Sequence, residues 1–186
     1  MDTELVVRAQ RGDHGAFTAL ATMTYGRMHR VAQNILSDVD RAEDAAQQAV
    51  VEIWRKLPQL RDAGRFEAWS YRIVVNCCYA EARRAKHWLP GLEGDRDEDH
   101  GAAEAMTSVV YRDQLERGFR NLPLDHRTVL VLHHYLGLPL HEVAAVLGVP
   151  EGTVHSRLSR ATVAMRAALE ADERTPDLPG RGERVR

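Results

Sequence analysis

Residues with apolar character recur every three or four positions through two long stretches of the chain, a spacing that indicates amphipathic helices. The first stretch predicts an all-helical domain over residues 1–88. Its four expected helices cover residues 3–10, 13–36, 38–57 and 66–86. The positions that carry this pattern, and that we expect in the core, are Phe17, Leu20, Thr24, Met28, Val31, Ile35, Ala42, Ala45, Ala46, Ala49, Val50, Ile53, Leu57, Trp69, Ile73, Cys77 and Ala80.

Residues 89–108 interrupt the helical pattern, because they are rich in glycine and acid and hold no apolar period. Such a composition predicts a flexible acidic linker. Helical spacing resumes near Val109 and predicts a second compact domain over residues 109–171, in which Asp125 is placed to cap a helix. The polar tail, 172–186, is expected to be disordered. The fold class is therefore all-α, with two small helical domains joined by a linker.

The stretch from Leu138 to Ala168 predicts a helix-turn-helix within the second domain. Gly148-Val149-Pro150 separates its two helices, because glycine suits a helix C-cap and proline disfavours helical geometry in the residue before it. The second helix has one apolar stripe, formed by Val154, Leu158, Ala161 and Met165. At about 100° per residue, Ser156, Ser159 and Arg160 point the opposite way, flanked by His155 and Arg157.

The polar face of this second helix suits the major groove of DNA. Arginine can pair bidentately with guanine, and serine can contact base edges or phosphate. An ordinary αα-hairpin with a solvated polar face is the alternative that the pattern leaves open.

The composition is typical of a protein that works in a reducing, aqueous compartment. No apolar run approaches the ~20 residues that span a bilayer, and the acidic start of the chain lacks the order of a secretory signal. The only cysteines, Cys77 and Cys78, are neighbours that are poorly placed to bridge each other, so we expect buried free thiols. A cytoplasmic protein without membrane insertion follows as the expectation.

The net charge of −2 counts against a stand-alone protein that binds DNA strongly. Basic residues nevertheless cluster at Arg83, Arg84 and Lys86, and again near Arg157. If nucleic acid is the ligand, we expect the protein to bind it together with a partner and not alone.

Enzyme motifs are incomplete. His141-Glu142 begins like a zinc-protease box, but the second histidine is absent, and the neighbours His133 and His134 point about 100° apart in a helix. The sequence also has no phosphate-binding loop and no nucleophile elbow. We therefore expect neither catalysis nor a metal or cofactor.

Three motifs in order resemble a known family. The run 43–48, EDAAQQ, followed by Ile53-Trp54-Arg55, resembles the polymerase-binding helix of bacterial sigma factors. The run 66–76 resembles the adjoining −10 element helix, and the run 122–161 resembles the −35 reading domain. Their order and spacing, over about residues 5–170, are similar to the extracytoplasmic-function (ECF) group of the sigma-70 family, which keeps only these two domains.

This resemblance implies a protein that binds core RNA polymerase, at the β′ clamp helices and the β flap, and directs transcription initiation at promoter DNA. The polymerase does the chemistry. An anti-sigma factor is a candidate further partner, because many family members are held by one. The face toward the clamp helices would include Asp44, Gln47, Gln48 and Trp54. Composition alone favours a solvated helix face for the first three, and Trp54 also suits the core.

The resemblance also assigns residues to DNA. The −10 element would be handled by Arg61, Arg65, Tyr71, Arg72, Asn76, Arg83 and Arg84, which offer charge, hydrogen bonds and, at Tyr71, a stacking ring or a core residue. The −35 element would be read by Thr153, His155, Ser156, Arg157, Ser159 and Arg160, of which Thr153 and Arg157 are expected to meet phosphate.

Two other classes of protein remain open at this point. A conventional helix-turn-helix regulator would bind duplex DNA alone and use the N-terminal domain for dimerisation or sensing. If the protein is an adaptor that binds only other proteins, charge changes at Arg160 should have no effect on transcription.

Overall fold

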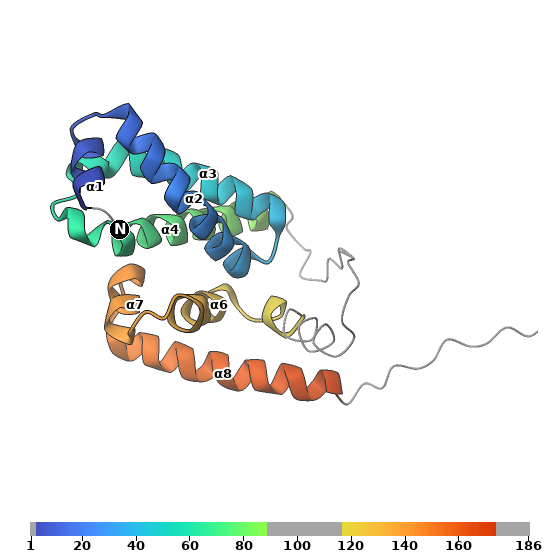
Figure 1. Cartoon of the computed structure of the whole chain (residues 1–186). Coiled ribbons are helices and arrows are strands. Elements are labelled where there is room, and N and C mark those ends of the chain that lie inside the picture. The colour runs from blue at the N-terminus through green and yellow to red at the C-terminus, as the bar shows by residue number, and fades with distance from the viewer. Residues whose placement is uncertain (1–2, 89–116, 174–186) are drawn as a thin grey trace, which may run out of the picture.

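The computed structural model describes residues 3–88 and 117–173, and every regular element in these two ranges is helical. The helices of residues 3–88 form one layer and those of residues 117–173 form a second layer below it (Figure 1). Side chains are described for residues 3–85 and 117–170. The all-α prediction is confirmed, whereas the predicted linker, 89–108, lies outside the described residues.

The N-terminal layer consists of four α-helices and two single-turn helices: α1 (Thr3–Gln10), α2 (His14–Leu36), α3 (Val39–Lys56), η1 (Leu57–Gln59), η2 (Ala63–Arg65) and α4 (Phe66–Trp88). Asp13 and Asp38 cap α2 and α3, because each side chain accepts a hydrogen bond from a backbone N–H in the first turn. Between these helices, Ser37 adopts the left-handed conformation with φ 54° and ends α2. These caps fix the helix boundaries close to where the sequence predicts them.

The core of this layer follows the predicted apolar stripes. Leu20, Met28 and Ile35 from α2 are fully buried, as are the alanines that line the inner face of α3. Small alanines allow α3 to approach α2 and α4 closely. Among the predicted core residues, Phe17, Val50, Trp69 and Ala80 are only partly buried, because they lie at the rim of the packed region.

The C-terminal layer is built from α6 (Leu124–Leu130), a π-helical turn η3 (Val131–Tyr135), α7 (Leu140–Leu147) and α8 (Glu151–Glu173). Gly148 ends α7 in the left-handed conformation, with φ 67°, and α8 begins three residues later. Val143, Val154 and Ala161 are buried between α7, α8 and the rest of this layer. The predicted helix-turn-helix is therefore present. Helix α8 includes residues 172 and 173, which the sequence assigns to the tail, and 174–186 lie outside the described residues.

One local prediction is wrong. Asp125 does not cap the helix that contains it: Pro123 occupies the N-cap position of α6, without a side-chain cap. Asp125 lies in the first turn, where its carboxylate accepts a hydrogen bond from Tyr79 and pairs with Arg157. The Asp125 carboxylate therefore interacts with residues that are distant in the sequence and does not cap α6.

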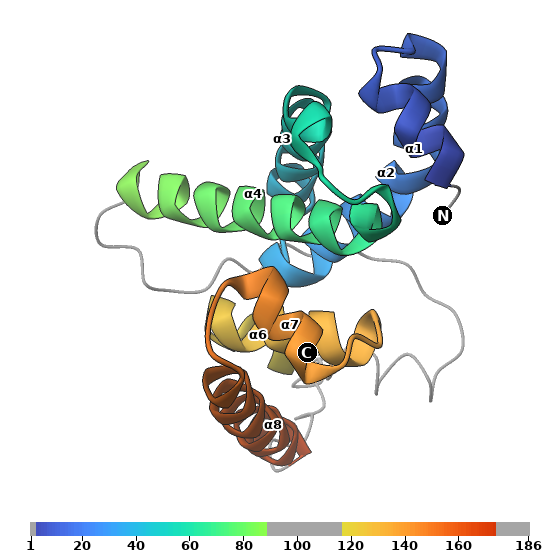
Figure 2. The same ribbon diagram turned by 90° about the vertical axis from the view of Figure 1, so that its left-hand side faces the viewer.

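The two layers are packed against each other. Figure 2 shows α4 lying across α6 and α7. The hydroxyl of Tyr79 on α4 donates to Asp125 on α6 at 2.7 Å, and Arg127 on α6 donates to the backbone oxygen of Leu36 and to the hydroxyl of Ser37. Along α4, four of the five residues from Tyr71 to Val75 are buried.

Candidate nucleic-acid and polymerase interfaces

The reading face predicted on α8 is exposed to solvent. His155, Ser159 and Arg160 are exposed, and Ser156 beside them is half-buried. The guanidinium of Arg160 donates to the backbone oxygen and to the hydroxyl of Ser156, both at 3.2 Å, so its side chain lies along the helix. The hydroxyl of Ser156 in turn donates to the backbone oxygen of Thr153 at 3.0 Å. Because these are surface contacts with neighbours on the same helix, the face can rearrange around a base edge at small cost.

Arg157 is placed differently from these residues. Its side chain is 25% exposed, and its Nη2 lies 2.7 Å from Oδ2 of Asp125 on α6. A bidentate contact to phosphate would compete with this ion pair. The contact of Arg157 with phosphate stays a prediction. Its ion-pair partner, Asp125, was not anticipated, because the sequence pattern assigned Asp125 to a helix cap.

A second basic surface follows α4. Arg72, Asn76 and Arg83 are exposed at i, i+4 and i+11, which places them on one narrow stripe of the helix. Arg84 is exposed beside it and is paired with Glu81. These positions present guanidinium and amide donors in a row, as a single-stranded phosphate backbone requires.

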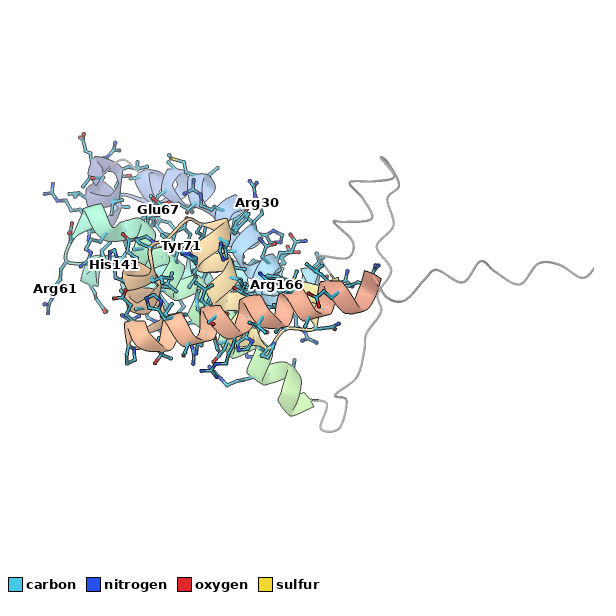
Figure 3. All side chains as sticks on the ribbon, turned by 90° about the horizontal axis from the view of Figure 1, so that it is seen from below. Arg30, Arg61, Glu67, Tyr71, His141 and Arg166 are labelled. Carbon is cyan, nitrogen blue, oxygen red and sulfur yellow. The ribbon has the colours of Figure 1, made fainter. Side chains whose placement is uncertain are left out.

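The loop before α4 adds two more exposed arginines. Arg61 precedes the single-turn helix η2 and Arg65 is its last residue, and Arg61 projects into solvent (Figure 3). Asp62 caps this turn, since its carboxylate accepts from the backbone N–H of Gly64 at 2.9 Å. The short capped turn therefore holds the two arginines at the N-terminal end of α4.

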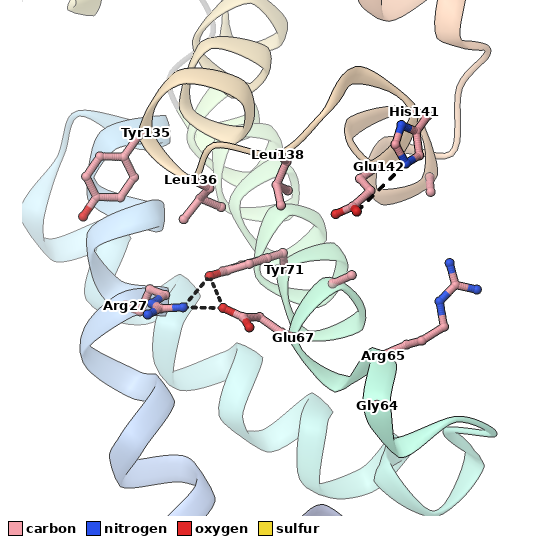
Figure 4. Close-up of a pocket in the computed structure, with 12 residues that line it drawn as sticks. Arg27, Gly64, Arg65, Glu67, Tyr71, Tyr135, Leu136, Leu138, His141 and Glu142 are labelled. Carbon is pink, nitrogen blue, oxygen red and sulfur yellow. Dashed lines mark hydrogen bonds and ion pairs between the residues drawn. The ribbon is translucent and has the colours of Figure 1, made fainter. Parts of the chain in front are cut away.

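Tyr71 departs from this exposed group. It is 3% exposed, and its hydroxyl lies 3.3 Å from Nη1 of Arg27 and 3.2 Å from Oε1 of Glu67, two residues that are also paired with each other (Figure 4). Burial raises the pKa of Tyr71, so the phenol is neutral at physiological pH. In this arrangement Tyr71 has no free face on which a base could stack, and its predicted role depends on a change of structure.

Arg27 and Glu67 were missed at the sequence level because they lie 40 positions apart, and only the packing of α2 on α4 brings them together. Together with Tyr71 they line a cavity of about 750 Å³ between the two layers. Its opposite wall comes from the C-terminal layer, at Leu136, Leu138, His141 and Glu142 (Figure 4).

The predicted polymerase-binding residues lie on the outer surface of α3. Asp44, Gln47 and Gln48 are exposed, and Trp54 is 37% exposed. The Trp54 ring packs against Phe17 and His14 on α2, with ring centroids 4.6 Å and 5.1 Å apart. Trp54 therefore has one face in the fold and one face available to a partner.

An apolar hollow lies beside this face. Ala21, Thr22 and Tyr25 from α2, together with Gln47 and Val50 from α3, line a hollow of about 470 Å³. The next residue along α3, Val51, is 49% exposed. The mixture of exposed apolar groups with an acid and amides is suited to a protein partner more than to DNA.

The described residues contain no group of three or more histidine, cysteine or acidic side chains that could hold a metal ion. Cys77 and Cys78 are free and buried, as predicted, and burial raises the pKa of their thiols to about 11 and about 12. Such thiols are protonated and unreactive at neutral pH. Within the described chain, no helix combines the length and the apolar character needed to cross a membrane.

Two family descriptions match the chain. "Sigma-70 region 2" matches residues 20–87, and "Sigma-70, region 4" matches residues 112–165. The first match includes all of α4 except its last residue, and with it the arginine stripe. The second includes α7, the turn after it and the first part of α8, up to residue 165.

Relatives extend this similarity over most of the chain. The RNA polymerase sigma-H factor of Pseudomonas aeruginosa is 32% identical over 181 residues, which cover 91% of this chain and 94% of the relative. The ECF RNA polymerase sigma-E factor of Escherichia coli strain K12 is 32% identical, with 88% and 92% covered.

Solved structures share the fold. CnrH, solved in complex with the cytosolic domain of CnrY, has a TM-score of 0.68 at 25% identity, covering 92% of this chain and 98% of CnrH. The sigma factor RpoE of Bartonella quintana, solved with the anti-sigma factor NepR, also has a TM-score of 0.68, at 23% identity, covering 84% and 98%. With two region matches in order and relatives of this similarity and coverage, the chain belongs to the ECF group of sigma-70 family RNA polymerase sigma factors.

Proposed function

We propose that this sigma factor divides promoter recognition between the two arginine-bearing surfaces described above. Residues 1–88 would bind core polymerase and handle the −10 element, and residues 109–171 would read the −35 element. Residues 89–108 would connect them. The observation that carries the proposal is that both surfaces remain exposed in a chain whose net charge is −2, so basic residues are concentrated where DNA is expected.

At the −35 element, Arg160 and Ser156 would contact base edges, with His155 and Ser159 beside them on the exposed face of α8. Thr153 lies in the first turn, where backbone N–H groups attract phosphate. Arg157 would meet the backbone after exchanging its Asp125 partner for a phosphate. Phosphate contacts of this kind fix register, and base contacts supply sequence preference.

At the −10 element, the exposed stripe Arg72, Asn76 and Arg83, with Arg84, would follow the melted strand, and Arg61 and Arg65 would extend this track at the loop. Tyr71 would take part only once the cavity between the layers opens. The support for this track is its narrow, continuous geometry along one helix.

Core polymerase would bind the outer surface of α3 at Asp44, Gln47, Gln48 and Trp54. Trp54 is braced by Phe17 and His14, so a partner would meet an aromatic ring whose conformational entropy is already restricted. We also place the protein in the cytoplasm, where core polymerase works. An anti-sigma factor is a proposed regulator, which the complexes of CnrH and RpoE support.

The test is binding to purified bacterial core polymerase, with binding to promoter-containing DNA alone measured in parallel at the same salt. Asp44→Arg should impair polymerase binding with unchanged helicity, and Asp44→Asn should impair it less. Sequence-specific DNA binding without affinity for core polymerase would overturn the proposal and favour a conventional regulator.

A further inference from the structure

One apolar side chain protrudes from the outer side of α8. This helix lies on the side of the C-terminal layer that faces away from helices α1 to α4 (Figures 1 and 2). Val163 is 65% exposed, which makes it the most exposed large apolar residue in the part of the chain that the structure describes. Single exposed apolar residues are common on protein surfaces. What sets Val163 apart is therefore its position on α8, and not its exposure alone.

Val163 lies in the same row of α8 as residues that are proposed to read DNA. It follows Ser156 by two turns, so the two side chains point within about 20° of each other at ~100° per residue. Ser159 and Arg160 are its i−4 and i−3 neighbours on the helix surface. Val154, which is 0% exposed, points in the opposite direction. The side chain of Val163 therefore continues the exposed reading face and lies opposite the buried stripe.

The distance along the helix keeps Val163 within the reach of a contact in the major groove. At ~1.5 Å per residue, Val163 lies about 10 Å from Ser156 and about 4–5 Å from Arg160 along the helix axis. Base pairs follow one another every ~3.4 Å, so these spans correspond to about three base pairs and to one or two base pairs when α8 lies along the groove. A helix that contacts DNA at both Ser156 and Arg160 therefore brings Val163 to a neighbouring base pair.

The polar residues of the reading face leave one group of the major groove without a partner. The four residues proposed to read bases, between His155 and Arg160, offer hydrogen-bond donors and acceptors. The C5 methyl group of thymine is the apolar group that base edges present in the major groove, and apolar side chains contact it. Val163 offers two methyl groups and no hydrogen-bonding group in its side chain. It therefore matches thymine better than any other base.

The surroundings of Val163 favour DNA over a protein partner. Apolar surfaces that bind proteins are contiguous patches with a desolvated centre. Val163 instead lies next to the polar, exposed Ser159 and Arg160, and the exposed Ala167 one turn further on adds only one methyl group. A single branched apolar side chain in such a polar frame suits a polar groove that presents single methyl groups.

We propose that Val163 is a further specificity-determining residue of the −35 contact and selects thymine through its C5 methyl group. This inference rests on the proposed function, because it requires the exposed face of α8 to lie in the major groove. The sensitive thymine should lie one or two base pairs from the pair that Arg160 contacts. Burial of its methyl group should strengthen binding by about threefold to fivefold.

Two reciprocal variants exchange a methyl group and a hydroxyl at neighbouring positions of α8. Val163→Thr keeps the branched shape and makes the side chain polar. Thr162→Val is the matched control, because it makes the opposite exchange at an exposed residue that points about 100° away. The hydroxyl of Thr162 donates to the backbone oxygen of Leu158 in the same helix at 2.9 Å. Arg160→Ala reports separately on the −35 contact as a whole.

The test uses holoenzyme assembled from the full chain and bacterial core polymerase. A preferred promoter is first selected from a duplex library of random sequence, separately for the wild type and for each variant. Each thymine of the selected −35 element, on either strand, is then replaced in turn by deoxyuridine, which removes only the C5 methyl group. Binding of each substituted duplex at fixed salt gives the loss with the wild type divided by the loss with the variant.

At one thymine, the wild-type and Thr162→Val holoenzymes should lose about threefold to fivefold in affinity on substitution by deoxyuridine. The Val163→Thr holoenzyme should bind the two duplexes almost equally. Selection with Val163→Thr should also relax the preference for thymine at that position only. Affinity for core polymerase without DNA should be the same for these three proteins.

Equal losses for the wild type and Val163→Thr at every thymine would overturn the proposal. So would a preferred −35 element without thymine within two base pairs of the pair that depends on Arg160. Weaker binding of Val163→Thr to core polymerase alone would assign Val163 to a protein contact instead. If Arg160→Ala also leaves the selected sequence unchanged, the proposed −35 function fails as well. A selection that changes with Arg160→Ala but not with Val163→Thr would remove only the role of Val163.

Discussion

Helices α4 and α8 both have 23 residues and both carry exposed arginines, but their surroundings differ. α8 has one buried stripe, marked by Val154 and Ala161, and its opposite face is open. α4 is covered by its own layer on one side and by the C-terminal layer on the other, and among its described side chains only Arg72, Asn76, Arg83 and Arg84 are exposed. The difference shows that the proposed −35 face on α8 is open in the fold, whereas much of the proposed −10 helix, α4, is covered by packing.

Loss of a core side chain from α4 should have the largest effect on stability. Phe66 is 1% exposed at the first residue of that helix, so Phe66→Ala should lower the free energy of unfolding by about 3–5 kcal/mol. Thermal or urea unfolding followed by circular dichroism measures this loss. A change below about 1 kcal/mol would mean that α4 is not the packed centre described here.

On α8, a change on the open face should affect DNA and leave stability alone. Arg160→Ala should weaken use of −35-dependent promoters by about 1–3 kcal/mol if the guanidinium reads a guanine. Run-off transcription with reconstituted holoenzyme gives this value. Arg166→Ala, also exposed on α8 but on a different side of the helix, is the matched control. Equal output from both variants would remove Arg160 from base reading.

The turn between α7 and α8 should respond to backbone strain. Gly148 has φ 67°, and a Cβ added there would meet only the end of the Arg72 side chain, at 3.8 Å. Gly148→Ala should therefore cost about 1–2 kcal/mol, from the left-handed backbone and not from a clash. Chemical denaturation measures the loss. An unchanged midpoint would show that the turn can relax to another geometry.

The smallest effect concerns pH. The backbone N–H of Ala16 and then the Arg8 guanidinium lower the pKa of Asp13, so the ionised cap contributes stability above the ordinary aspartate range and loses it as pH falls through the lowered pKa. Asp13→Asn keeps the capping oxygen but does not titrate. Thermal melting from neutral pH to acid should fall slightly more steeply for the wild type than for this variant. Parallel curves would indicate that the cap contributes little.

The helices and their inner faces could be predicted from the amino-acid sequence. Spacing identified the stripe of Val154 and Ala161, and the glycine–proline turn located the helix-turn-helix, because these signals are local. The exposed arginines of both candidate DNA surfaces also followed from the sequence. Local geometry decides which side of a helix a residue occupies, and that is readable without the fold.

What covers α4 is visible only in the packed fold. The sequence placed Asp125 at a helix cap and left Tyr71 between core and DNA, since neither pattern reveals a partner on another helix. In the fold, Asp125 bonds Tyr79, 46 positions away, and Tyr71 bonds Arg27, 44 positions away. Such contacts depend on how separately patterned helices pack, because helical periodicity encodes a buried face without encoding which surface buries it.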